Sequence, residues 1–189
     1  RYANRDGVIR LLVVGGSLGA QALNETVPTA IAQLQQSGLK FDVKHQTGKR
    51  TLDVATRAYE QAGVAGDVTA FIDDMAAAYS WADVLIARAG ALTCAEIAAA
   101  GLPAVLVPFP HAVDDHQTAN AVALQQAGSA KILQQRDMTA DSLATVLREI
   151  GVSDREQLQQ RAEAARLVAK PQATARISDV CAQLAGGNV

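Results

Sequence analysis

The sequence predicts an α/β fold, a Rossmann-like doubly wound parallel sheet of about six strands covered by helices on both faces. Short apolar runs alternate along the chain with segments in which apolar residues recur at helical spacing. The apolar runs are nearly continuous, as in strands that are buried on both faces. Small and polar residues follow these runs. Because ligands of such sheets bind beyond the carboxyl ends of the strands, these residues form the candidate site.

The first three strand and helix units are expected within residues 8–81. Their strands are the apolar runs 8–14, 41–45 and 68–72. The first helix follows a glycine loop at 15–20, ends before Ser37-Gly38, and has apolar residues at helical spacing: Leu23, Val27, Ile31 and Leu34. The second helix, over about 51–62, follows a polar turn at 46–49. Asp73 and Asp74 suit the positive end of a third helix over 75–81.

The second half of the chain supplies three more strands and the closing helices. The strands are expected at 84–87, 104–107 and 130–133. A helix over 92–100 ends at Gly101 as its C′ residue, and the polar segment 111–117 leads into a helix through about Ala127. Thr139 is expected to cap a helix that runs to Ile150. The last two helices are a capping-box helix, Ser153-Asp154-Arg155-Glu156 to about Val168, and 173–184.

Composition limits the function classes. With 49% hydrophobic and 19% charged residues and a net charge of −2, the chain is globular and lacks the basic stripe of a nucleic-acid-binding protein. Cys94 and Cys181 have no CxxC spacing, so we expect reduced cysteines in a cytoplasmic protein and no zinc site. No apolar run approaches the roughly 18 residues of a membrane span. The polar start without methionine favours a single domain, 1–189, cut from a longer protein.

The fourth unit carries a candidate phosphate site. A tight turn at 88–91 leads from the strand into a helix, whose amino end presents unpaired N–H groups and a partial positive charge. The backbone of Gly90, Ala91, Leu92 and Thr93 is therefore a candidate cradle for a pyrophosphate, and glycine allows close approach.

Glu96, three residues after Thr93, has two interpretations. Thr93 and Glu96 have the spacing of a capping box, which would satisfy the helix's own N–H groups. Alternatively, Glu96 accepts hydrogen bonds from a ribose diol while the preceding amides hold the phosphates of the same nucleotide. The local sequence alone favours the cap.

Two common nucleotide sites do not fit the sequence. The glycine loop 15–19 has no glycines at the first, third and sixth positions of a dinucleotide fingerprint, and Gly48-Lys49-Arg50 is not a Walker motif. Polar residues nevertheless follow several strands and are expected at one rim. They suit a nucleotide sugar: backbone at 71 and 72 for a base, helix amides for pyrophosphate, and the Gln117 and Asn120 amides for sugar hydroxyls.

With these residues the chain resembles the MurG glycosyltransferases, which transfer N-acetylglucosamine (GlcNAc) from UDP-GlcNAc to lipid I, the undecaprenyl-pyrophosphoryl-MurNAc-pentapeptide, to give lipid II in peptidoglycan synthesis. Five stretches in order carry the resemblance and cover most of residues 9–133. They are 15–20; 71–75; 88–93 with Glu96; Gly101-Leu102-Pro103; and Pro108-Phe109 with Asp115-His116-Gln117 and Asn120.

The resemblance implies a GT-B architecture of two Rossmann-like domains, of which this chain is the carboxyl-terminal, donor-binding half. It implies an inverting transferase without cofactor or metal, in which Arg88 offsets charge on the UDP leaving group. In the family a glutamine pair stands where this chain has His116-Gln117, so which of the two reaches the sugar is open, and Gln117 is favoured. The implied donor-binding residues are Ser17, Phe71, Ile72, Gly90, Ala91, Leu92, Thr93, Glu96, His116, Gln117 and Asn120.

The resemblance also places functions outside this chain. The lipid I site, the general base and a membrane-binding patch belong to an amino-terminal domain that would precede Arg1. The whole protein is then expected on the cytoplasmic face of the inner membrane, with cell-wall and division machinery as partners and no nucleic acid. This polypeptide alone should bind UDP-GlcNAc and transfer it poorly or not at all.

Other interpretations remain. The chain is alternatively another UDP-sugar GT-B protein, such as a UDP-GlcNAc 2-epimerase, or a non-catalytic nucleotide-sugar-binding module. At single residues, Ser17 is alternatively a helix cap and Arg88 a surface ion-pair residue. His45 and His111 are expected to be structural, and Trp81 is expected in the core.

Overall fold

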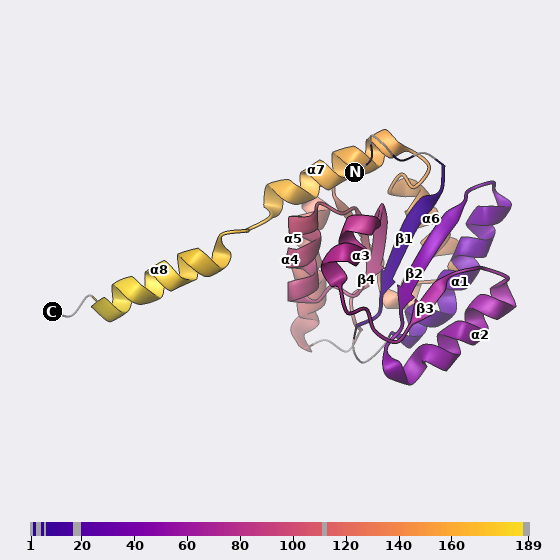
Figure 1. Cartoon of the computed structure of the whole chain (residues 1–189), viewed down its shortest axis with the longest axis horizontal. Coiled ribbons are helices and arrows are strands. Elements are labelled where there is room, and N and C mark those ends of the chain that lie inside the picture. The colour runs from indigo at the N-terminus through magenta and orange to yellow at the C-terminus, as the bar shows by residue number, and fades with distance from the viewer. Residues whose placement is uncertain (1, 3–4, 6, 17–19, 111–112, 187–189) are drawn as a thin grey trace.

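The computed structural model describes residues 2, 5, 7–16, 20–110 and 113–186. Six parallel strands form one sheet in the order β3-β2-β1-β4-β5-β6 (Figure 1). The strands are β1 Ile9–Val14, β2 Phe41–Gln46, β3 Asp67–Thr69, β4 Val84–Ala87, β5 Ala104–Leu106 and β6 Ala130–Ile132. The predicted doubly wound Rossmann-like sheet is therefore confirmed.

The register brings the carboxyl ends of all strands to one level. Val14, the last residue of β1, pairs with Gln46 and with Ala87. Gln46 pairs in turn with the last residue of β3, and Ala87 with the last residue of β5, which pairs with the end of β6. The segments that follow the strands therefore begin along one edge, where a doubly wound sheet binds its ligands.

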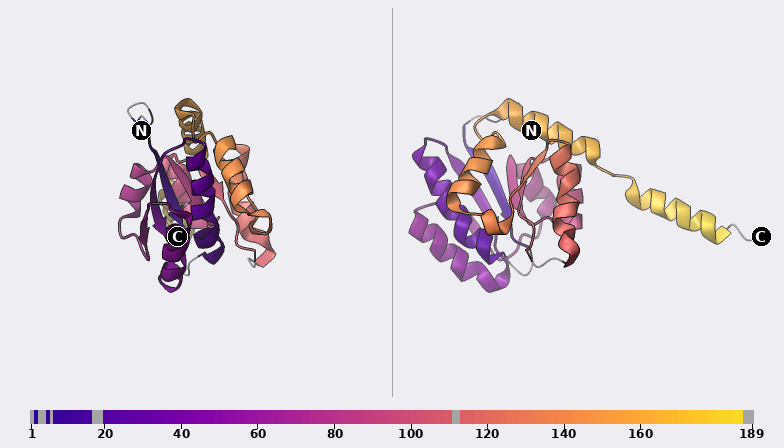
Figure 2. Two further views of the ribbon diagram at one scale, coloured as in Figure 1. Left: turned by 90° about the vertical axis from the view of Figure 1, so that its right-hand side faces the viewer. Right: turned by 180° about the vertical axis from the view of Figure 1, so that it is seen from behind.

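Helices cover both faces of the sheet. α1, α2 and α6 lie on one face, and α3, α4, α5 and α7 pack on the other side (Figure 2). The helices are α1 Gln21–Gln36, α2 Leu52–Ala62, α3 Met75–Trp81, α4 Ala91–Ala100, α5 His116–Gln126, α6 Ala140–Glu149, α7 Arg155–Val168 and α8 Ala173–Gly186. Short 3₁₀ turns occupy Lys49–Thr51, Val113–Asp115 and Gln135–Asp137.

The core has two layers because successive side chains of a strand point to opposite faces. In β4, Val84 and Ile86 pack toward α1 and α6, whereas Leu85 and Ala87 pack toward α3, α4 and α5. All four side chains are buried. A strand that is covered on both faces needs an unbroken apolar run, which is the pattern that predicted it.

Several sequence predictions are confirmed by local contacts. The four spaced apolar residues of α1, from Leu23 to Leu34, are fully buried. Asp74 caps α3 by accepting a 2.8 Å hydrogen bond from the amide of Ala77. Thr139 caps α6 and accepts a 3.1 Å hydrogen bond from the amide of Ser142. Gly101 ends α4 with a left-handed φ of 62°.

The predicted end of the third strand and the predicted start of α7 are wrong. The third strand ends at Thr69 and not at Ile72, because its partner β2 ends at Gln46, opposite Thr69. The capping box of α7 is also wrong: Asp154, and not Ser153, is the N-cap, and its carboxylate accepts from the amides of Glu156 and Gln157 at 3.0 and 3.1 Å.

His45 and Trp81 occupy structural positions. His45 is fully buried in the α1 and α2 layer, with Nδ1 3.1 Å from the hydroxyl of Tyr59. Burial lowers the pKa of His45 to about 3, so the ring is neutral near pH 7. Trp81 is half-buried against the opposite layer, and Lys44 Nζ lies 4.8 Å from its ring centroid. His111 lies outside the described residues.

A buried carboxylate fastens the amino-terminal edge of the sheet. Asp83 forms ion pairs with Arg5 at 2.9 Å and Arg155 at 2.6 Å and accepts a 3.0 Å hydrogen bond from the amide of Arg10. Burial alone would raise the pKa of Asp83, but these contacts outweigh it and lower the pKa. Tyr2 adds a 2.8 Å hydrogen bond to the Asp83 carbonyl. The amino-terminal segment and the start of α7 are thus joined at the start of β4.

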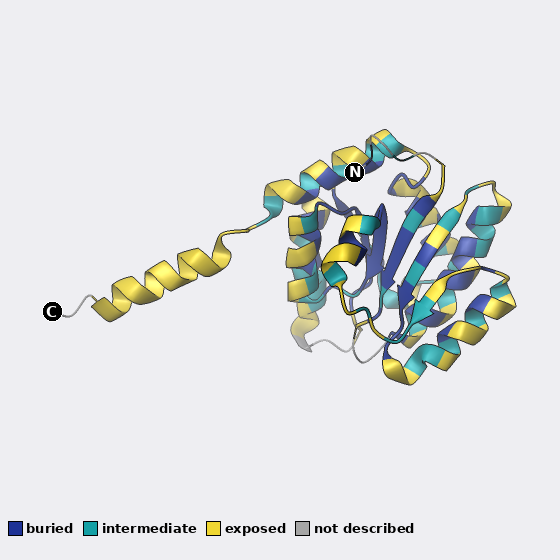
Figure 3. Cartoon of the chain, viewed as in Figure 1, coloured by how far each residue is buried: buried dark blue, intermediate teal, exposed yellow. Residues whose placement is uncertain are grey.

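α8 lies apart from the layered core (Figures 1 and 3). All its described residues are exposed, including Ile177, Val180 and Leu184, which recur at helical spacing. None of the described helices is both long and apolar enough to cross a membrane. The expectation that residues 1–189 form a single domain stays a prediction.

Candidate functional site

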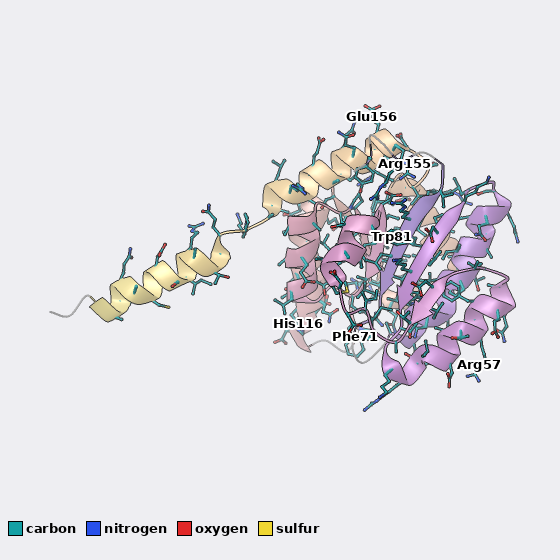
Figure 4. All side chains as sticks on the ribbon, viewed as in Figure 1. Arg57, Phe71, Trp81, His116, Arg155 and Glu156 are labelled. Atoms are coloured by element: carbon teal, nitrogen blue, oxygen red, sulfur yellow. The ribbon has the colours of Figure 1, made fainter. Side chains whose placement is uncertain are left out.

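The candidate site lies where the strand order reverses, between β1 and β4. α1 follows β1 to one face of the sheet, whereas α4 follows β4 to the other. The two connections therefore diverge beyond the ends of β1 and β4, which is the usual ligand position in this fold. Figure 4 places Phe71 and His116 at this end of the molecule, opposite Arg155 and Glu156.

The connection after β1 is held against β2. The amide of Gly15 donates to the carbonyl of Gln46 at 2.9 Å, and a Cβ at position 15 would lie 3.1 Å from the amide nitrogen of Ala20. Gly16 has a φ of 83°, and its amide donates to Oε1 of Gln46 at 3.0 Å. Glycine at position 15 permits close packing, and glycine at position 16 permits a left-handed backbone. Ser17 lies outside the described residues, so its predicted nucleotide contact stays a prediction.

The predicted base-binding segment leaves the sheet after Thr69. Phe71 is 66% exposed, whereas Ile72 packs partly against the α3 and α4 layer. The carbonyl of Ala70 accepts a 3.1 Å hydrogen bond from Nε2 of Gln46. Because Gln46 is the last residue of β2, the polar turn that was predicted at 46–49 begins at Thr47. Reasoning from the sequence missed Gln46 as a link between two loops at the candidate site.

The amino end of α4 lies at the same edge. Gly90 is its N-cap, without a side-chain hydrogen bond, and the first helical bond runs from the amide of Cys94 to the carbonyl of Gly90 at 2.9 Å. The amides of Ala91, Leu92 and Thr93 therefore precede the helical hydrogen-bond ladder and have no partner within it. This is the geometry of an anion site at a helix N-terminus, and phosphate binding there stays a prediction.

The capping-box interpretation of Glu96 is wrong. Thr93 is the third residue of α4 and not its N-cap, so Glu96 has no capping threonine three residues earlier. Oε2 of the exposed Glu96 instead accepts a 2.9 Å hydrogen bond from the hydroxyl of Tyr79 in α3. Burial and the Glu96 carboxylate raise the pKa of Tyr79, which stays a hydrogen-bond donor. Ribose binding by Glu96 stays a prediction.

Arg88 joins three connections at the carboxyl edge. Its Nη1 donates to the carbonyls of Val107 and Pro108, each at 3.2 Å, and its Nη2 donates to Oε1 of Gln135 at 2.6 Å. The guanidinium also lies 5.6 Å from the ring centroid of Phe109. Burial lowers the pKa of Arg88, but an arginine remains charged. The contacts support a positioning role, and the predicted role at the leaving-group phosphate stays a prediction.

The residues expected at the sugar brace the neighbouring loops. Oε1 of Gln117 accepts from the amide of Phe109 at 2.9 Å, and Nδ2 of Asn120 donates to the carbonyl of Ala89 at 3.0 Å. His116 begins α5 and is exposed. Gln117 and Asn120 therefore come from one helix that connects the segments following β4 and β5, and their sugar contacts stay predictions.

The segment before α5 has an uncommon backbone. Asp114 and Asp115 both have a φ of 51°, in the left-handed region that residues other than glycine seldom adopt. Asp115 Oδ1 accepts a 2.7 Å hydrogen bond from Thr118, which holds this turn against α5. Such strained positions gather at functional sites, in agreement with the location of this edge.

Acidic and thiol groups do not gather into a metal site in the described part of the chain. The expectation of a reaction without a metal or other cofactor stays a prediction.

Cys94 is buried in α4, and burial raises the pKa of its thiol to about 11. This cysteine is thus a packed apolar residue and not a nucleophile at pH 7.

Comparison with known proteins agrees with this geometry. The family model described as "Glycosyltransferase family 28 C-terminal domain" matches residues 10–177. The chain is 55% identical over 186 residues to the UDP-N-acetylglucosamine--N-acetylmuramyl-(pentapeptide) pyrophosphoryl-undecaprenol N-acetylglucosamine transferase of Cupriavidus metallidurans. That match covers 98% of this chain and 51% of the relative, so the chain spans about half the length of the curated relatives it matches.

Solved structures give the same assignment. The chain matches the crystal structure of Acinetobacter baumannii MurG with a TM-score of 0.86 and 44% identity, over 95% of this chain and 51% of that one. A putative UDP-N-acetylglucosamine 2-epimerase from Listeria monocytogenes matches with a TM-score of 0.68 but 12% identity, over 97% of this chain and 47% of that one, which shows the shared fold alone. The predicted resemblance to MurG is confirmed, and the identities favour it over the epimerase alternative.

Proposed function

Since the chain belongs to the glycosyltransferase family 28 C-terminal domains, we propose that it is the donor-binding half of an inverting glycosyltransferase. The whole protein would transfer GlcNAc from UDP-GlcNAc to lipid I and form lipid II in peptidoglycan synthesis. The name of the 55% identical relative, an N-acetylglucosamine transferase, supports this assignment. The fold supports it too, because the sheet presents one ligand edge with a helix N-terminus at the switch point.

The observation that carries the proposal is the arrangement of α4. Three amides at its first turn, from Ala91 to Thr93, have no partner in the helix, and Glu96 stands about one turn, or about 5.4 Å, further along. The amides would hold the pyrophosphate of UDP-GlcNAc, and the Glu96 carboxylate would accept hydrogen bonds from the ribose hydroxyls. One short helix thus offers donors to the phosphates and an acceptor to the ribose of the same nucleotide.

The proposed chemistry stabilises the departing UDP. When the bond to the anomeric carbon breaks, negative charge grows on the β-phosphate, next to the positive end of α4. Arg88, whose guanidinium lies half-buried after β4, would add a fixed positive charge. Because these groups supply the required charge, we propose that no metal cofactor takes part.

The other proposed contacts follow from placing the pyrophosphate and ribose of the donor at α4. The backbone of Phe71 and Ile72 would read the uracil edge, Ser17 would contact the nucleotide, and Gln117 with Asn120 would bind the GlcNAc hydroxyls. His116 stays the alternative to Gln117.

We assign the acceptor chemistry to the part of the protein beyond this chain. Lipid I binding, the general base and membrane attachment would belong to an amino-terminal domain, with the whole protein peripheral on the cytoplasmic face of the inner membrane. Contacts with cell-wall and division machinery would also involve the whole protein. The 189-residue chain alone would bind donor but transfer it poorly or not at all.

Calorimetric titration tests the proposal. The 189-residue chain is titrated without added metal with UDP-GlcNAc, UDP, ADP-glucose and NAD, and the UDP-GlcNAc titration is repeated with EDTA and with Mg²⁺. We expect binding of the two uridine nucleotides alone, with unchanged affinity under all three metal conditions. Preference for ADP-glucose or NAD would overturn the assignment, and loss of binding in EDTA would overturn the metal-free chemistry.

A further inference from the structure

Gln46 links the two loops that would flank the nucleotide. It is the last residue of β2, between β1 and β3 in the sheet, and is only 4% exposed. Its Oε1 accepts from the amide of Gly16 at 3.0 Å, and its Nε2 donates to the carbonyls of Gly16 and Ala70, both at 3.1 Å. One buried side chain thus connects the segment after β1 with the segment after β3.

The hydrogen bonds of Gln46 require an amide. Its oxygen faces an N–H group, and its nitrogen faces two carbonyl oxygens, so both ends of the amide are matched. A glutamate at pH 7 would keep the acceptor but place negative charge beside two carbonyls. A methionine of similar length would leave the amide of Gly16 and the carbonyl of Ala70 without this partner, at a cost because buried polar groups need hydrogen bonds.

The linked segments have neighbouring places in the proposed donor site. Gly16 directly precedes the predicted nucleotide contact Ser17, and Ala70 directly precedes Phe71 and Ile72, which would read the base. Ser17 follows β1 in the sequence, whereas Phe71 and Ile72 follow β3. The side chain of Phe71 is 66% exposed. Gln46 supplies a direct tie between the two segments.

We propose that Gln46 is a positioning residue that sets the spacing between Gly16 and the base-reading segment, and so the affinity and base preference for uridine nucleotides. This inference rests on the proposed function. Gln46 would not touch the nucleotide. It acts through the backbone of Gly16 and Ala70, because a small displacement of a binding group weakens a well-fitted site.

The test compares Gln46→Met with His45→Gln in the 189-residue chain. His45 is the adjacent residue of β2, but its side chain lies in the opposite layer against Tyr59, away from both loops. Thermal unfolding is recorded for each variant, and Kd values for UDP and CDP are measured at a temperature at which all proteins are folded. The two nucleotides carry the same phosphates, so the ratio of their Kd values reports base recognition alone.

We expect Gln46→Met to weaken UDP binding by about tenfold, equivalent to about 1.4 kcal/mol, and to bring the Kd values for UDP and CDP closer together. His45→Gln should lower the melting temperature and leave both Kd values unchanged. Unchanged UDP affinity and base preference in folded Gln46→Met would overturn the inference while leaving the proposed function standing. Failure of the unsubstituted chain to bind UDP would refute the proposed function and the inference together.

Gln46→Glu provides a second test if the methionine variant does not fold. A protonated glutamic acid again offers one donor and one acceptor, whereas the carboxylate offers acceptors alone. UDP-GlcNAc has no phosphate group that titrates near neutral pH, so we expect its affinity for the glutamate variant to rise severalfold from pH 8 to pH 5. The unsubstituted chain should change little over this range, and equal pH profiles for the two proteins would contradict the proposed role.

Discussion

Glu96 shows how one carboxylate can have a partner and still be available to a ligand. Its Oε2 is bound to the Tyr79 hydroxyl, but the residue is exposed on α4, one turn from the candidate phosphate cradle. Tyr79 therefore orients the carboxylate without enclosing it. The hydrogen bond also suggests how to separate direct binding by Glu96 from an effect on the packing of α3 against α4.

Glu96→Ala should weaken UDP-GlcNAc binding by about 1–3 kcal/mol, because ribose hydroxyls would lose their acceptor. Tyr79→Phe is the matched control, since it removes the hydroxyl and leaves the carboxylate. Calorimetric titration should show the larger loss for Glu96→Ala, with similar melting temperatures. Equal losses in the two variants would mean that Glu96 acts through Tyr79 and not on the ribose.

His45 makes the stability of the chain depend on pH. Its pKa is about 3 in the folded chain, below the ordinary value of 6.5, so the unfolded chain takes up the proton first as pH falls. The stabilisation from neutral His45 is therefore present above about pH 6.5 and is lost on acidification toward pH 3.

Urea unfolding at pH 7, 6 and 5 tests this effect. We expect the contribution of His45 to the free energy of unfolding to approach a loss of about 1.4 kcal/mol per pH unit below its unfolded pKa. His45→Gln removes this titration and keeps every other ionisable group, so the difference between the two slopes isolates it. Parallel pH profiles would show that His45 takes up its proton in the folded chain as readily as in the unfolded one.

Residue types and spacing predicted the elements that carry the candidate site better than they predicted the contacts of its side chains. The position of Ala91 to Thr93 at a helix start follows from the pattern of apolar run, glycine turn and helix. The hydrogen bond between Glu96 and Tyr79 does not follow from this pattern, because Tyr79 belongs to another helix and only packing brings α3 to α4. The role of Gln46 was not predicted, because the sequence Gln46-Thr47-Gly48 is typical of a turn and not of the end of a strand.

At the scale of elements, the start of α7 shows where local patterns stop being decisive. Ser153 and Asp154 are both good N-cap residues, and Ser153 has the glutamate spacing of a capping box. The turn from α6 into α7 places Asp154, and not Ser153, over the free amides. The third strand is similar, because its length is set by the end of β2 and not by its own apolar residues.

Asp154→Ala should lower the free energy of unfolding by about 1 kcal/mol, the usual value of an N-cap side chain. Ser153→Ala should change it by no more than about 0.5 kcal/mol, as expected for an exposed residue outside the cap. Chemical denaturation of the two variants measures the difference. The reverse order would restore the capping box that the sequence predicted.

The whole molecule combines a closely packed sheet domain with a helix that adds little to it. The order of six strands and the two helical layers were predictable, because buried parallel strands and amphipathic helices have different periods. The position of α8 was not, since its apolar positions, Ile177, Val180 and Leu184, have the spacing of a core helix. In this structure these three residues are exposed. The local pattern therefore predicts that the segment is helical but does not predict where the helix packs.

Shortening the chain after Gln172 should leave the sheet domain intact. Because the described residues of α8 are exposed, we expect the free energy of unfolding to change by less than about 0.5 kcal/mol. Urea denaturation of the shortened and full chains provides the measurement, and circular dichroism should show the loss of one helix. A substantial loss of stability would show that α8 packs on the domain in solution.

The contacts that hold the amino-terminal segment at Asp83 have a practical consequence for handling the protein. Tyr2 and Arg5 are held at the start of β4, whereas the candidate site lies beyond the end of the same strand. A biotin tag added ahead of the first residue would therefore attach the molecule to a biosensor surface by the edge opposite the site. Immobilised in this orientation, the domain would present its nucleotide-binding edge to flowing solution.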